Sequence, residues 1–84
     1  MDYNIVLTSR ARKELTKFEI SLQKRIMNEL NNLSQDSVNI DIKKLKDDDF
    51  YRLRIGDYRA VFKFELNTII VVKIAHRKDI YKKK

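Results

Sequence analysis

The residues with the clearest chemical potential are arginines that alternate with apolar residues. Arg52 and Arg54 are separated by one residue, and Arg59 follows the dipeptide Gly56-Asp57. Guanidinium groups match phosphate oxygens two at a time and keep their charge under all working conditions. They can therefore bind a phosphodiester and stabilise the extra negative charge of its pentavalent transition state. The spacing indicates a phosphate site, provided that the backbone brings these side chains to one face.

A β-hairpin would bring them together. Residues 50–55 and 58–65 each alternate in the manner of a strand, and Gly56-Asp57 suits a two-residue hairpin turn. In this register Ile55 pairs with Tyr58, and Arg54 lies directly opposite Arg59, with Arg52 next along the same face. The register that gathers the arginines also forms an apolar face, whose pairs are Tyr51–Phe62 and Leu53–Ala60.

A third strand is predicted from the β-branched run at 69–74. A three-residue loop at 66–68 would pair Glu65 with Ile69 and would send Ile70, Val72 and Ile74 to the apolar face. A two-residue loop would place Lys73 among the core side chains, so we favour the longer loop. The resulting basic cluster, which we call the arginine face, is expected to lie near Tyr81 and to contain Arg52, Arg54, Arg59, Lys73 and Arg77.

The first half of the chain must supply the cover for the apolar face. Asn4–Leu7 predicts a short strand, which Thr8 or Ser9 follows as a helix cap. Two amphipathic helices are then predicted, the second after the capping type Ser21, from apolar residues at helical spacing: Ala11, Leu15 and Phe18, then Leu22, Ile26, Leu30 and Leu33.

The expected fold is therefore α+β. An N-terminal strand and a helical hairpin precede a three-stranded antiparallel meander, in the order β-α-α-β-β-β, and the helices pack on one face of the sheet. With 84 residues, we expect a single domain over residues 1–84 without room for an enclosed cofactor cavity.

The composition excludes several classes of function. The chain has no cysteine, a single histidine (His76) and a single glycine (Gly56), whereas thiolate metal sites, zinc-protease helices and nucleotide-binding loops need more of them. No apolar run approaches the roughly 20 residues of a membrane span, and the N-terminal segment lacks a hydrophobic signal core. We expect a cytoplasmic protein with no membrane association, no metal and no small-molecule cofactor.

The charge is concentrated in the second half of the chain. Of the 19 basic and 12 acidic residues behind the net charge of +7, residues 1–42 contain six of each, which leaves 13 basic and six acidic residues for 43–84. This surplus indicates an anionic partner. Lys43, Lys44 and Lys46 either bind phosphates of such a partner or are merely exposed.

Three segments resemble the RelE branch of the RelE/ParE toxin superfamily: KKLK at 43–46, FYRLRIGDYR at 50–59 and HRKDIY at 76–81. The resemblance covers nearly the whole chain. It implies the toxin of a toxin–antitoxin system, a ribosome-dependent mRNA endoribonuclease. In that chemistry the 2′-hydroxyl of the RNA attacks the adjacent phosphodiester without a metal. The implied partners are a cognate antitoxin protein, the ribosome and mRNA.

The resemblance also assigns roles to residues. Arg52 and Arg54 match the paired basic residues of the family, Arg59 and Arg77 match two arginines expected to clamp the transition state, and Tyr81 matches a tyrosine that orients the substrate or joins proton transfer. Some members carry lysines in place of the first pair, and a lysine can act as a base where an arginine hardly can.

The general base is therefore left to Tyr81 or to His76, although strand parity alternatively places His76 on the core side. Two other functions compete with the nuclease. One is a ParE-like DNA gyrase inhibitor without nuclease activity, and the other is a non-catalytic RNA-binding domain. The retained arginines and Tyr81 favour the nuclease.

Overall fold

Two helices and a mixed sheet make up the part of the chain that the computed structural model describes, residues 3–35, 42–45 and 49–80. The sheet has the strand order β1-β5-β4-β3-β2, in which β1 runs parallel to β5 and the other neighbours are antiparallel. The elements in chain order are β1 (Asn4–Leu7), α1 (Ser9–Thr16), α2 (Ile20–Ser34), β2 (Ile42–Lys44), β3 (Tyr51–Ile55), β4 (Tyr58–Glu65) and β5 (Thr68–His76).

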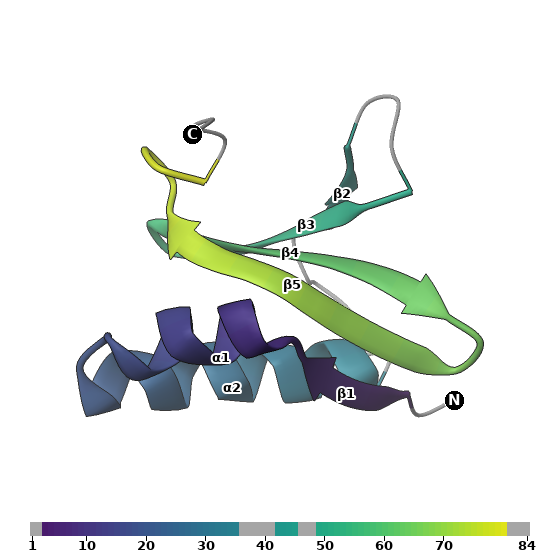
Figure 1. The fold of residues 1–84 in the computed structure, drawn as a ribbon, viewed down its shortest axis with the longest axis horizontal. Coiled ribbons are helices and arrows are strands. Elements are labelled where there is room, and N and C mark those ends of the chain that lie inside the picture. The colour runs from purple at the N-terminus through teal and green to yellow at the C-terminus, as the bar shows by residue number, and fades with distance from the viewer. Residues whose placement is uncertain (1–2, 36–41, 46–48, 81–84) are drawn as a thin grey trace.

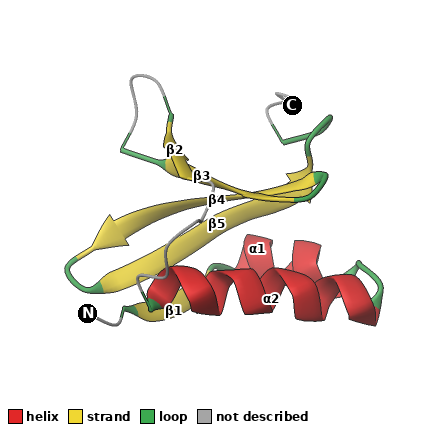
Figure 2. Ribbon diagram, turned by 180° about the vertical axis from the view of Figure 1, so that it is seen from behind, coloured by secondary structure: helices red, strands yellow, loops and turns green. Residues whose placement is uncertain are grey.

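Both helices cover the same side of the sheet, and the turn after β5 lies on the other side (Figure 1). The view from behind shows the same two layers, with the longer helix α2 running beneath β3 to β5 (Figure 2). The α+β fold with helices on one face is thus confirmed. None of the helices in the described segments has the length and apolar character needed to cross a membrane.

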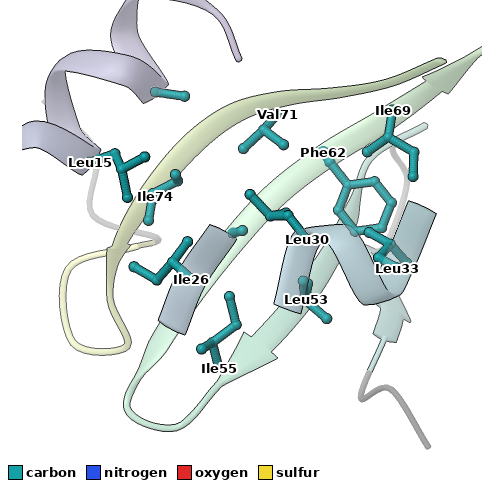
Figure 3. Packing of buried hydrophobic residues seen from close by; sticks show 12 residues of the cluster. Leu15, Ile26, Leu30, Leu33, Leu53, Ile55, Phe62, Ile69, Val71 and Ile74 are labelled. Atoms are coloured by element: carbon teal, nitrogen blue, oxygen red, sulfur yellow. The ribbon is translucent and has the colours of Figure 1, made fainter. Parts of the chain in front are cut away.

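The core lies between the two layers and consists mainly of residues at the predicted periodic positions (Figure 3). Ile26, Leu30 and Leu33 of α2 are buried against the strands, where Leu53 and Phe62 are fully buried. Thr8 caps α1, since its hydroxyl accepts a hydrogen bond from the Ala11 amide at 3.2 Å. The predicted cap at Ser21 is wrong, because α2 begins at Ile20 with Glu19 as its N-cap residue.

The β3–β4 hairpin has the predicted register. Ile55 pairs with Tyr58, Arg54 with Arg59, Leu53 with Ala60 and Tyr51 with Phe62. Gly56 has a positive φ of 58°, which a glycine adopts at little cost, and an added Cβ would lie 2.8 Å from Nη2 of Arg25. Turn chemistry and apolar alternation agree here, so the register follows from the sequence alone.

The β4–β5 hairpin differs from the prediction. Its turn is the two-residue one, which pairs Glu65 with Thr68 and directs Ile69 and Val71, rather than Ile70 and Val72, to the core. A β-bulge then shifts the register, so that Phe62 pairs with Val71 but Val61 pairs with Lys73. The extra residue restores the predicted facing of Lys73 and of Ile74, which is buried. The prediction failed because it assumed one uniform register.

A further strand is present that the sequence did not predict. β2 is only three residues long and pairs with β3, Lys43 opposite Arg52 and Lys44 opposite Tyr51. All three of its residues are exposed, so it carries no buried apolar pattern from which a strand could be inferred. The pairing with β3 extends the sheet and places lysines beside the hairpin.

Candidate functional site

The sheet face opposite the helices carries the predicted basic cluster. Residues directly opposite each other on paired strands project from the same face. The pairs Lys43–Arg52 and Val61–Lys73 therefore form one row across the sheet, and Arg54–Arg59 begins a second row. The structure thus brings Arg52, Arg54, Arg59 and Lys73 together on the arginine face, and it adds Lys43 to them.

Arg59 is the buried member of this cluster, with only 8% of its surface exposed. Its Nη1 donates hydrogen bonds to the carbonyl oxygens of Gly56 at 2.8 Å and of Tyr58 at 2.9 Å. Two of its interactions are therefore with the β3–β4 turn. Arg54, its cross-strand partner, is exposed. A ligand can therefore reach the side chain of Arg54, whereas that of Arg59 is mostly buried.

Arg77 is fixed to the same turn by its backbone. Its amide donates to the carbonyl oxygen of Asp57 at 2.7 Å, and its Nε lies 3.8 Å from Oδ1 of the same residue. The Arg77 side chain is 56% exposed, so this ion pair is screened and weak. An arriving phosphate can therefore compete for the guanidinium group, which stays close to the hairpin because its main chain is held there.

Lys73 holds the segment that follows β5. Its Nζ donates a hydrogen bond to the carbonyl oxygen of Ile80. The amides of Asp79 and Ile80 both donate to the carbonyl oxygen of His76, at 2.8 and 3.0 Å, which closes a tight turn. Lys73 thus fixes the main chain of the residue before Tyr81. Tyr81 and Lys46 lie outside the described residues.

His76 is not on the arginine face. Its ring makes an edge contact with Tyr58, with ring centroids 5.2 Å apart, and its Nδ1 accepts a hydrogen bond from the Lys78 amide at 3.1 Å. It lines a hollow on the helix side together with Phe18 and Lys17. Of the two alternatives for this histidine, the structure matches the one in which strand parity directs it toward the helices.

The two lysines of β2 are also separated. Lys43 lies opposite Arg52, on the arginine face, whereas Lys44 lies opposite Tyr51, whose ring packs against the core. Lys44 lines a different hollow, which it shares with Phe64 and Glu65. Adjacent residues of a strand project to opposite sides, so only one of the two lysines can serve a ligand on the arginine face.

An apolar groove that the sequence did not predict lies on this same face. The groove has a volume of about 240 Å³ and is lined by Arg10, Leu45, Phe50, Val61, Val72, Lys73 and Ile80. Val61 and Ile80 are almost fully buried although they are outside the main core. The sequence did indicate that Phe50 lies on this face, because it has the same strand parity as Arg52 and Arg54. No local pattern indicates that Ile80 folds back over the sheet.

Residues 5–81 match the family of ParE toxins of type II toxin–antitoxin systems. The chain belongs to the RelE/ParE toxin superfamily. Toxin RelE3 of Methanocaldococcus jannaschii is 40% identical over 52 residues, which are 61% of this chain and 59% of that protein. The chain thus matches less than two thirds of that relative's length.

Solved structures support the assignment to the RelE/ParE superfamily. The RelB–RelE antitoxin–toxin complex from Methanococcus jannaschii matches with a TM-score of 0.75 and 29% identity, over 90% of this chain and 94% of that one. The RelE–RelB complex from Pyrococcus horikoshii has the same fold, with a TM-score of 0.76 and 24% identity over 94% and 99% of the two chains. The membership of the RelE/ParE superfamily that the three sequence segments indicated is confirmed.

Proposed function

We propose that this RelE/ParE-superfamily toxin is a ribosome-dependent endoribonuclease that cleaves mRNA. The observation that carries the proposal is the exposed guanidinium group of Arg77, which is held at the turn that joins the strands of Arg54 and Arg59. A phosphodiester that meets this cluster is approached by guanidinium groups from two separate segments of the chain. Such an arrangement suits the charge that develops on a phosphorane.

The proposed reaction uses the RNA as its own nucleophile. The 2′-hydroxyl loses its proton and attacks the adjacent phosphorus, the bond to the 5′-oxygen breaks, and that oxygen takes up a proton. The products are a 2′,3′-cyclic phosphate and a 5′-hydroxyl. In this proposal Arg54 and Arg77 bind the non-bridging oxygens, and Arg52 and Lys43 bind flanking phosphates.

Proton transfer is assigned to Tyr81 rather than to His76. His76 faces the helix side of the sheet, while the Ile80 main chain is anchored by Lys73 on the arginine face. Arg59 is given a positioning role, since it is buried and bonded to the turn that holds Arg77.

We infer a cognate antitoxin as the regulatory partner. The relatives with solved structures include RelB–RelE complexes from two archaea. An acidic segment that folds on this chain would be attracted by the basic surplus of residues 43–84. The ribosome and mRNA are the proposed target.

The test is Arg77→Ala. We expect cleavage of translated mRNA to fall about a hundredfold to a thousandfold, because removal of one transition-state donor typically has this effect. The fold should persist, since the side chain is mostly exposed. Mapping of mRNA 5′ ends in a translating extract measures the effect. Arg12→Ala, on the exposed surface of α1, is the control with the same loss of charge.

Gyrase inhibition is the second candidate, and the match to the ParE toxin family favours it. The same preparation is therefore assayed for DNA supercoiling. Intact mRNA together with blocked supercoiling would replace the nuclease with the gyrase inhibitor. RNA binding with neither activity would indicate the non-catalytic domain.

A further inference from the structure

The apolar groove on the arginine face is the feature that the proposed chemistry leaves unused. It is lined by Val61 on β4, by Phe50, which directly precedes β3, and by Ile80 in the turn after β5. Arg10 of α1 and Lys73 of β5 also line it. Phosphate binding alone does not require such an apolar lining. The groove therefore suits a ligand that combines an apolar group with negative charge.

The β-bulge in β5 contributes directly to this groove. Val71 and Ile74 are both buried in the main core, and the two residues between them, Val72 and Lys73, both line the groove. In regular pairing, consecutive residues would point to opposite faces. The bulge therefore adds an apolar side chain and a cation to the same side, in keeping with the frequent use of bulges beside functional sites.

The dimensions favour one flat ring system. The volume of about 240 Å³ is smaller than the roughly 300–1,000 Å³ of pockets for drug-sized ligands. Val61 lies directly opposite Arg52 on the neighbouring strand. The backbones of Arg52 and Val61 are therefore about one strand spacing, roughly 5 Å, apart, so a phosphate bound by Arg52 and a ring over Val61 can belong to a single nucleotide.

We propose that this groove is a nucleobase subsite, in which a base of single-stranded RNA stacks on Phe50 while its phosphate is held by the arginine face. The subsite rests on the proposed function, because it assumes an RNA ligand. Aromatic stacking tolerates any base, since every base has a π-face. Selectivity among the bases would then come from Arg10, which lines the groove and whose guanidinium is paired with Glu14 at 3.3 Å.

The experiment compares two short single-stranded RNAs that differ at one position, where one has a base and the other is abasic. Wild-type protein is expected to bind the complete RNA about tenfold or more tightly than the abasic one, the usual effect of one stacked base. Phe50→Leu should abolish this difference, and Phe50→Tyr should retain it. Phe64→Leu is the matched control, because Phe64 is 38% exposed on the helix side of the sheet.

Equal binding of the two RNAs by the wild type overturns the subsite, and so does an undiminished difference in Phe50→Leu. Circular dichroism checks that each variant is folded, and Phe50→Met provides a second non-aromatic variant if the leucine variant does not fold. The cleavage assay on ribosomes is run in parallel on wild-type protein. Cleavage without base-dependent binding overturns the subsite alone, whereas base-dependent binding without cleavage overturns the nuclease alone.

Discussion

The arginines of the basic face have divided roles. Arg59 is buried and bonded to two carbonyl oxygens of its own hairpin, whereas Arg54, directly opposite, is exposed. Like charges opposite each other on a sheet are destabilising, by up to roughly 1 kcal/mol. The carbonyl oxygens around Arg59 offset this repulsion, because they accept hydrogen bonds from its guanidinium. Arg59 therefore stabilises the hairpin turn, whereas Arg54 presents its side chain to solvent on the same face.

Arg59→Ala should lower the free energy of unfolding by about 1.5–3 kcal/mol, since hydrogen bonds from a charged donor are lost in a buried place. Arg54→Ala should change it by less than about 0.5 kcal/mol, as is usual for exposed positions. Urea unfolding followed by circular dichroism gives both values. Equal losses in the two variants would refute the division of roles.

At the scale of elements, strand parity decides which cations face the ligand. β2 extends the sheet by three residues and so places Lys43 and Lys44 on opposite sides. The bulge in β5 has the same kind of effect, because without it Lys73 would point toward the core. Two small departures from regular meander geometry thus assemble much of the basic face.

Lys43→Ala should weaken binding of single-stranded RNA and reduce the slope of log K against log salt by about 0.7, the value for one lost phosphate contact. Lys44→Ala, which removes the same charge from the neighbouring residue, should leave both quantities unchanged. A salt titration of RNA binding by fluorescence anisotropy separates the two variants. A similar loss in Lys44→Ala would show that only net charge matters.

At the scale of the whole molecule, stability and ligand binding are assigned to opposite faces of the sheet. The helices and the near face of the sheet form the main hydrophobic core, and the far face keeps its cations and its groove. A domain of this size buries a smaller fraction of its surface than a larger domain does, so its stability depends on few residues. Both layers must be present before the arginine face has a fixed shape.

Leu30→Ala should lower the free energy of unfolding by about 2–5 kcal/mol, because a fully buried side chain leaves a cavity between α2 and the sheet. Ile20→Ala, at a 64% exposed position of the same helix, should change it by less than about 0.5 kcal/mol. Chemical denaturation measures both. A loss in Leu30→Ala no larger than that in Ile20→Ala would contradict the placement of the core.

The sequence by itself determined the features that depend on local periodicity and turn chemistry. Helical spacing predicted the core residues of α1 and α2, and alternation around Gly56-Asp57 predicted the β3–β4 register that gathers Arg54 and Arg59. These predictions hold because neighbouring residues alone fix the face that a side chain occupies.

Only the tertiary structure decided the rest. The bulge at Val72 reconciles a two-residue turn at one end of β5 with the burial of Ile74 at the other. The strand β2 exists through its pairing with β3, and the groove exists because Ile80 folds back to line it together with Val61 and Phe50. Each of these features satisfies contacts between residues far apart in the chain, and no local pattern encodes such contacts.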